Sequence, residues 1–113
     1  MLKPDILRNK KDFSALYGKG KSAGGKYVVL FYRKNNLGYN RRAFLASKKV
    51  GDSVRRNRAR RLMKESYRLL PGRLPTGYDI LFIARKSAAD KGVKCGEVGG
   101  SMRALLKKCG LLK

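Results

Sequence analysis

Residues 47–68 read SKKVGDSVRRNRARRLMKESYR, and this stretch decides the fold. Small and apolar side chains recur in it at helical spacing, which predicts a helix from Val54 to Leu70 with one buried stripe. Asp52 or Ser53 can cap the first turn of this helix, and Pro71-Gly72 can end it. The buried stripe is expected to consist of Ala59, Leu62, Met63, Ser66 and Leu70.

Cations gather on the remaining faces of this helix. Arg55, Arg56 and Arg58 lie in its first turn, where the helix dipole disfavours each positive charge by about 0.3 kcal/mol or more. Like charges four residues apart, such as Arg56 and Arg60, add repulsion. A helix shaped for stability alone would avoid this arrangement, so we prefer phosphate binding to a merely solvated surface. The candidate residues are Arg55, Arg56, Asn57, Arg58, Arg60, Arg61, Lys64 and Arg68.

Asn57 is the uncharged member of this group. Its amide can hydrogen-bond a base edge or a sugar hydroxyl, which a pure charge patch would not need. It can equally make a local contact with the backbone near the start of the helix. The sequence leaves both interpretations open.

The whole chain is strongly basic. Its 113 residues carry 29 Lys and Arg against 7 Asp and Glu, with no histidine, which gives a formal charge of +22. An apolar content of 42% still supports one packed domain over residues 1–113. The charge predicts a polyanionic partner, either nucleic acid or an anionic membrane surface, with an acidic protein less favoured.

The composition gives little support to catalysis by the protein itself. Histidine is absent, and the acids are scattered singly rather than clustered as a two-metal nuclease site requires. Cys95 and Cys109 do not form a CxxC pair; they can form a bridge, although two buried thiols on a last helix are favoured. We therefore expect no catalytic residue and no metal site built from protein alone.

Outward from the cationic helix, apolar, β-branched and aromatic runs predict strands at residues 27–32, 42–47 and 78–85. We expect a short first helix at residues 12–17 and a last helix from Cys95 or Glu97 to Lys108. The segment from Ala15 to Ala23 matches phosphate-loop patterns only in part and has the wrong flanking elements, so a mobile cationic loop is expected, with residues 18–25 flexible. These elements predict one α+β domain whose strand–helix–strand unit crosses over right-handed by default.

Aromatic side chains are concentrated in the first half of the chain, where they can stack on unpaired bases. In the strand at residues 27–32, side chains 27, 29 and 31 should point to one face and 28, 30 and 32 to the other. Both faces are apolar, so the sequence leaves open which of them is free. The candidates are Phe13, Tyr17, Tyr27, Phe31, Tyr32 and Phe44.

The segment Ser47-Lys48-Lys49-Val50-Gly51, followed after four residues by Arg56-Asn57-Arg58-x-Arg60-Arg61, closely resembles the signature of the bacterial ribonuclease P protein subunit. The similarity covers most of the chain, including Asp12-Phe13, Phe31-Tyr32 and Tyr78-Asp79-Ile80. It implies a single-domain α+β two-layer sandwich of three helices on a four-stranded sheet. It also implies an uncommon left-handed β-α-β crossover through the arginine-rich helix, in place of the default hand.

The resemblance implies a division of labour as well. A catalytic RNA subunit, which binds most of the Mg²⁺, would remove the 5′ leader of precursor tRNA by hydrolysis, and the protein would bind both RNAs as a subunit of this endoribonuclease. The cationic helix residues named above would contact the RNA subunit. A cleft between the first helix, the cationic helix and the sheet would hold the leader, through Phe13, Tyr17, Val29, Phe31, Ser47, Lys48, Lys49 and Arg85.

Two other classes of protein deserve comparison. A ribosomal or ribosome-assembly protein would share the charge and the small α+β fold, and the signature from Ser47 to Arg61 argues against it. A membrane-binding protein is less favoured, because no apolar run approaches the ~18 residues of a membrane span and no amphipathic segment keeps a bulky apolar face free. The N-terminal residues have no signal-peptide character, so a cytoplasmic location is expected.

Overall fold

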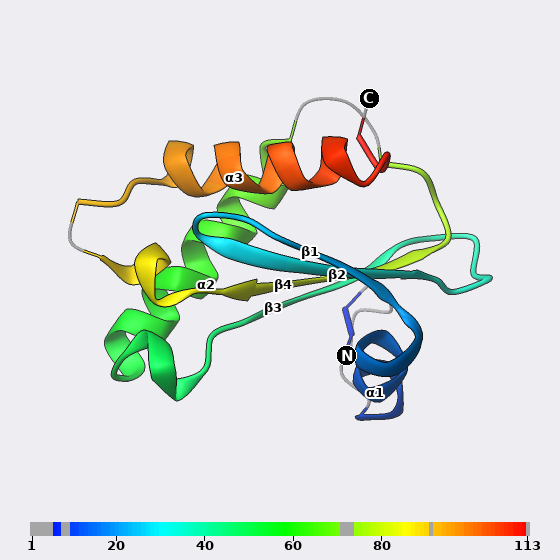
Figure 1. Ribbon diagram of the computed structural model, residues 1–113, viewed down its shortest axis with the longest axis horizontal. Helices are drawn as coiled ribbons and strands as arrows, with labels where there is room; N and C mark the ends of the chain where they lie inside the picture. Colours follow the sequence, from blue (N-terminus) through cyan, green and yellow to red (C-terminus); the bar gives the residue numbers. More distant parts are fainter. Residues whose placement is uncertain (1–5, 8–9, 71–73, 91, 113) are drawn as a thin grey trace.

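The computed structural model describes residues 6–7, 10–70, 74–90 and 92–112 (Figure 1). Three α-helices and a four-stranded sheet make up the fold, as expected. In chain order the elements are α1 (Lys10–Lys19), β1 (Lys21–Gly24), β2 (Val28–Lys34), β3 (Arg41–Leu45), the 3-10 turn η1 (Lys48–Val50), α2 (Ser53–Arg68), β4 (Tyr78–Ala84), the 3-10 turn η2 (Lys86–Ala89) and α3 (Cys95–Lys108).

The sheet is mixed, with the strand order β1-β2-β4-β3. β2 pairs antiparallel with both β1 and β4, whereas β3 pairs parallel with β4. A parallel pair needs a crossover connection, and α2 supplies it between β3 and β4. The left hand that the family resemblance implies for this crossover stays a prediction.

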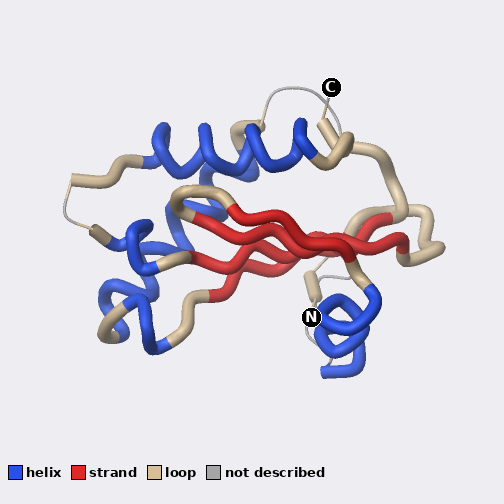
Figure 2. Tube along the Cα trace, viewed as in Figure 1, coloured by secondary structure: helices blue, strands red, loops and turns tan. Residues whose placement is uncertain are grey.

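The helices are divided between the two faces of the sheet. α2 and α3 cover one face, and α1 lies on the opposite side near one end of the strands (Figures 1 and 2). The face under α2 and α3 is the larger core, because alternate residues of β2 and β4 meet both helices there. Its fully buried side chains include Val28, Leu30, Met63, Ile80, Phe82, Val98 and Met102.

α2 forms as the sequence predicts. Asp52 is the N-cap, and its Oδ1 accepts a hydrogen bond of 3.0 Å from the backbone N–H of Arg55. Ala59, Met63 and Ser66 are buried, and the remaining stripe residues Leu62 and Leu70 are half-buried. The helix ends at Arg68, and the predicted stop at Pro71-Gly72 lies outside the described residues.

The expectation of a mobile loop over residues 18–25 is wrong. Lys21–Gly24 forms β1, which pairs with β2 in a register that sets Lys21 opposite Tyr32 and Gly24 opposite Val29. Backbone pairing rather than apolar burial holds this strand, since only Ala23 packs against the larger core. The second predicted strand is also shorter than expected, because the chain turns into η1 after Leu45 instead of continuing to Ser47.

The cysteines occupy opposite ends of α3. A helix rises about 1.5 Å per residue, so the two Cα atoms lie about 20 Å apart, whereas a disulfide needs about 4.4–6.8 Å. The bridge within one chain that the sequence left open is therefore excluded. Cys109 is a free, half-buried thiol at the end of the helix, and part of the favoured interpretation, its full burial, is also wrong.

Glycines on α3 and before β2 permit close packing. A Cβ added to Gly99 would lie 3.3 Å from Ser66 Oγ, so α2 and α3 approach each other through two small residues. A Cβ added to Gly25 would lie 2.8 Å from Ser101 Oγ and 3.1 Å from Leu105. These contacts give Gly25 and Gly99 a structural role that composition alone does not reveal.

Substitutions at the adjacent residues Met63 and Lys64 test which face of α2 is buried. Replacing Met63, which is fully buried, by Ala should lower the free energy of unfolding by about 2–4 kcal/mol through lost burial and a residual cavity. Replacing Lys64, which is exposed, by Ala should change it by less than about 0.5 kcal/mol. Urea denaturation of both variants measures the difference, and equal effects would contradict the assignment of faces.

Candidate nucleic-acid interface

The sheet face that carries α1 is only partly covered. Strand register arranges its side chains in three rows across β2, β4 and β3. Asp12 of α1 pairs with Arg41 in the first row, and Leu16 of α1 clusters with Leu81 and Ala43 of the second, whereas Ile83 and Leu45 of the third row pack at the margin of this cluster. From the covered end outward, the rows are Arg33, Asp79 and Arg41; Phe31, Leu81 and Ala43; and Val29, Ile83 and Leu45.

The third row is an apolar surface that the fold leaves accessible. Val29, Ile83 and Leu45 are each half-buried, whereas Leu81 in the covered row is fully buried. We call these three residues the open row. Val29 was predicted from the family resemblance; Ile83 and Leu45 were missed, although alternation within their strands and the parallel pairing together identify them.

Two aromatic side chains of α1 border the open row. Tyr17 is 49% exposed, and its ring meets that of Phe31 edge to face, with centroids 5.2 Å apart. Phe13 is half-buried in the smaller core that Leu16 and Leu81 form under α1. The structure thus brings the three predicted residues Phe13, Tyr17 and Phe31 to one side of the sheet.

Cations border the open row on the side away from the second row, where β3 and β4 end. β3 and β4 are parallel, so the residues that follow them, Lys48 and Lys49 in one case and Arg85 in the other, lie at the same end of the sheet. Arg85 reaches over Gly24, where an added Cβ would lie 2.7 Å from its Nη2 atom. Ser47 Oγ accepts a hydrogen bond of 3.3 Å from the Lys49 backbone and so caps η1.

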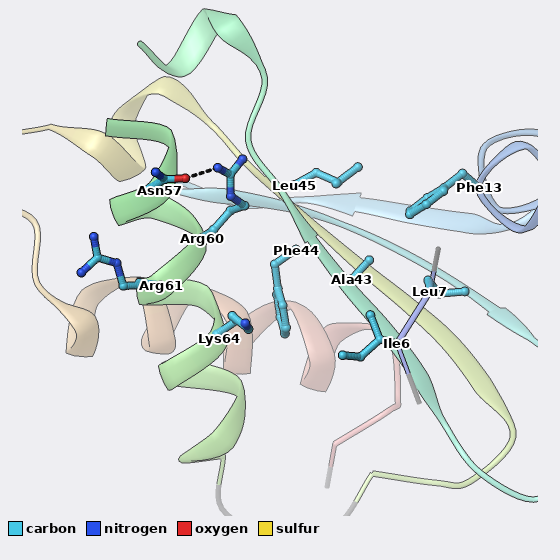
Figure 3. A pocket seen from close by; sticks show the side chains of 10 residues that line it. All are labelled: Ile6, Leu7, Phe13, Ala43, Phe44, Leu45, Asn57, Arg60, Arg61 and Lys64. Atoms are coloured by element: carbon cyan, nitrogen blue, oxygen red, sulfur yellow. Dashed lines mark hydrogen bonds between the residues drawn. The ribbon is translucent and has the colours of Figure 1, made fainter. Parts of the chain in front are cut away.

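A groove of about 420 Å³ runs along the outer edge of β3, between α1 and α2 (Figure 3). Its apolar wall comes from both sides of β3, from α1 and from Ile6 and Leu7 ahead of α1, and its polar wall comes from α2. No lining residue is acidic. The lining consists of Ile6, Leu7, Phe13, Ala43, Phe44, Leu45, Asn57, Arg60, Arg61 and Lys64. The groove lies between α1, the sheet and α2, and Phe13 alone of the predicted leader residues lines it, so the leader cleft stays a prediction.

Several cations of α2 form hydrogen bonds or ion pairs with other groups of the protein. Arg60 donates to Asn57 Oδ1, a side-chain contact that neither interpretation of Asn57 anticipated (Figure 3). Arg58 does not line the groove; it donates from Nη2 to the Val93 carbonyl at 2.8 Å. Arg68 pairs with Glu65, and its guanidinium lowers the pKa of that carboxyl. A role in binding stays a prediction for every member of the group.

The other aromatic candidates lie on the opposite face. Tyr27 is buried in the larger core, and its hydroxyl donates a hydrogen bond of 2.9 Å to Glu97 Oε2 on α3. The expectation that Tyr27 shares a face with residues 29 and 31 is wrong, because β2 begins at Val28 and strict alternation starts only there. Tyr32 and Phe44 also pack against the larger core.

In the described ranges, no three His, Cys, Asp or Glu side chains come together as a group able to hold a metal ion. Among those same residues, no helix has the length and apolar character needed to cross a bilayer.

Fold and site together define a small, strongly basic α+β protein in which a cationic helix flanks a partly open apolar sheet face. Solved structures share this architecture. An RNase P protein from Staphylococcus aureus superposes with a TM-score of 0.84 at 26% identity, covering 98% of this chain and 100% of that one. The RNase P protein from Thermotoga maritima gives 0.81 at 33% identity, covering 91% and 96%.

Sequence comparison identifies the family. The family model described as Ribonuclease P matches residues 1–110. A ribonuclease P protein component from Alkaliphilus metalliredigens is 43% identical over 106 residues, or 94% of each chain, and one from Clostridium botulinum is 44% identical over 111 residues, or 97% and 98%. The chain belongs to the ribonuclease P protein family of bacterial type. Membership implies a part in tRNA processing, as a subunit of an endoribonuclease whose partner is the ribonuclease P RNA.

The contact of Arg58 with Val93 generates a prediction about stability. Replacing Arg58 by Ala removes the charged donor that ties α2 to the segment before α3, so the free energy of unfolding should fall by about 1 kcal/mol. Replacing the exposed Arg61 by Ala should leave it nearly unchanged. Thermal and urea unfolding compare the two, and identical stabilities would show that the Arg58 contact contributes nothing.

Proposed function

We propose that this chain binds the ribonuclease P RNA through α2 and the single-stranded 5′ leader of precursor tRNA across the open row and the adjoining groove. The bound complex then removes the leader by Mg²⁺-dependent hydrolysis in the cytoplasm. The observation that carries the proposal is the open row itself: a half-buried apolar strip across three strands, with aromatic rings along one side and cations along the other.

The α2 part of the proposal rests on electrostatics. Arg55, Arg56, Arg60, Arg61 and Lys64 lie on α2, whose acid Glu65 pairs with Arg68 and whose N-cap Asp52 accepts from the backbone of Arg55. Within the described residues, none of these five cations is paired with a carboxylate. Guanidinium groups bind phosphate oxygens bidentately, and neutralising several phosphates gives affinity through counterion release. A folded RNA is the partner that offers phosphates at this density.

The leader part of the proposal rests on the shape of the open row. Unpaired bases expose flat apolar faces that stack on aromatic rings, and Tyr17 is the most exposed ring next to the row. The phosphates between these bases need cations, which Lys48, Lys49 and Arg85 supply at the end of the parallel strands. A duplex would hide its bases from such a surface, so a single strand fits better.

Mg²⁺ belongs mainly to the RNA in this proposal. The described part of the chain offers no group of carboxylates that fits a divalent ion, and most of its acids hold structural contacts instead. The protein assists by neutralising phosphates that would otherwise repel one another when leader and RNA subunit meet. Its side chains supply no nucleophile.

The decisive test adds the protein to a bacterial ribonuclease P RNA at low Mg²⁺ and follows cleavage of a precursor tRNA. We expect faster cleavage with the protein than without it, because added cations replace part of the counterion requirement. Lysozyme or another basic protein of similar size controls for bulk charge. Absence of stimulation beyond this control would overturn the proposal.

Variants on α2 and α1 should separate the two binding roles. Arg56→Ala and Arg60→Ala should each weaken affinity for the RNA subunit by about 1 kcal/mol or more and lower the log–log salt slope by about 1. Tyr17→Ala should leave that affinity intact and weaken precursor tRNA binding by about 1 kcal/mol through lost stacking.

Arg103 on α3 gives the matched control for these variants. It is an exposed arginine on α3, which covers the sheet face opposite the open row, so Arg103→Ala removes the same charge from a surface without a proposed role. Filter-binding titrations across a salt series measure the affinity of the four variants, Arg56→Ala, Arg60→Ala, Tyr17→Ala and Arg103→Ala, for the RNA subunit and for precursor tRNA. If Arg103→Ala weakens RNA-subunit binding as much as Arg60→Ala does, bulk charge rather than the α2 surface is responsible.

A further inference from the structure

An ionic network joins α1 to the covered end of the sheet. Arg41 of β3 uses three guanidinium nitrogens: Nε donates to Asp79 Oδ1 at 2.8 Å, Nη2 to Asp79 Oδ2 at 2.7 Å, and Nη1 to Asp12 Oδ2 at 3.0 Å. Asp79 belongs to β4 and Asp12 to the first turn of α1. One guanidinium thus bridges two strands and a helix.

The sheet side of this network is rigid. Asp79 is only 4% exposed, and its Oδ1 also accepts a hydrogen bond of 2.9 Å from Asn35 Nδ2. A bidentate pair with a buried carboxylate fixes the plane of the Arg41 guanidinium, and hydrogen bonding to Asp79 raises the pKa of Arg41 further. The remaining nitrogen, Nη1, therefore points in a fixed direction, toward α1.

α1 is attached differently at its two ends. Its C-terminal end leads directly into β1 through Gly20, whose backbone N–H donates to the Leu16 carbonyl at 3.0 Å. A Cβ at Gly20 would lie 2.5 Å from that carbonyl oxygen, so this tight junction requires glycine. At the other end, an ion pair between Asp12 and Arg41 ties the first turn of α1 to β3.

The position of Asp12 is otherwise unfavourable for binding RNA. It precedes Phe13, one of the aromatic residues beside the open row, in a chain whose charge of +22 suits a polyanion. A carboxylate there repels phosphates. The presence of this carboxylate is explained if it holds α1 in place rather than meeting the ligand.

We propose that Asp12 and Arg41 are positioning residues that latch α1 over the sheet, so that Phe13 and Tyr17 form the aromatic border of the leader site. This inference rests on the proposed function. Neither residue touches the leader; both act through α1, with Gly20 as the junction about which an unlatched α1 would shift.

The test measures binding of precursor tRNA and of mature tRNA, which lacks the leader, to the complex of the protein with a bacterial ribonuclease P RNA. Asp12→Ala should weaken precursor binding about fivefold and change mature tRNA binding and RNA-subunit affinity less than about twofold. Asp12→Asn keeps an oxygen acceptor for Arg41 and should stay within about twofold of the original protein for all three ligands.

The sign of the effect separates positioning from simple electrostatics. Removing a carboxylate near an RNA site should strengthen binding if charge alone matters. Asp90→Ala is the matched control, because Asp90 is exposed, lies far along the chain in the turn after η2, and loses the same charge. The latch is supported if Asp12→Ala weakens precursor binding while Asp90→Ala does not.

Three outcomes would overturn the latch. They are unchanged or tighter precursor binding by Asp12→Ala, an equal loss for precursor, mature tRNA and RNA subunit, and an equal loss by Asp12→Ala and Asp90→Ala. Failure of the proposed function is recognised separately, because the unsubstituted protein would then give no preference for precursor over mature tRNA.

Discussion

The packing of the small stripe of α2 against α3 and the sheet is the contact on which the rest of the structure depends. Ala59 and Met63 are fully inaccessible, and a Cβ added to Gly99 would lie 3.3 Å from Ser66 Oγ, so the two helices approach each other tightly at this point. Because this narrow stripe satisfies the burial of a 16-residue helix, the remaining positions are free to carry cations. The same helix connects β3 to β4, which makes these strands parallel and brings their following residues to one end of the sheet.

The periodic parts of the fold could be predicted, and the parts held by backbone pairing could not. α2, α3, β2 and β4 lie within a few residues of their expected ranges because apolar spacing marks them. β1 was missed because Lys21–Gly24 shows no such spacing. This strand forms because the backbone of β2 offers it hydrogen-bonding partners, and the sequence alone does not show that this edge of β2 is available for pairing. Tyr27 was placed on the wrong face because alternation was extended one residue beyond the strand.

Prediction of the site followed the same division. The signature residues on α2 and the aromatic residues on α1 came from local patterns, and the structure brings Phe13, Tyr17 and Phe31 together. The contacts and exposure of each side chain could be determined only from the structure. The long charged side chains of α2 look equivalent in sequence, yet tertiary packing gives Arg58 a carbonyl partner, and the seat of Arg85 depends on Gly24 in a strand that is distant along the chain.

The few acids show how a chain of +22 keeps its cationic surface free. A carboxylate placed among the cations of α2 would stabilise the folded protein against self-repulsion, but it would also compete with phosphates for the same guanidinium groups. Most acids in the described part of the chain serve elsewhere, in contacts that define where an element begins or sits. Those contacts are Asp12 and Asp79 with Arg41, Asp52 with the first turn of α2, and Glu97 with Tyr27. Among the described residues, Glu65 alone forms an ion pair with a cation of α2, and it does so at the last turn, farthest from the first-turn arginines and from the end of the sheet where Lys49 and Arg85 lie. The acids thus organise the fold at positions that leave most of the proposed binding surface unopposed.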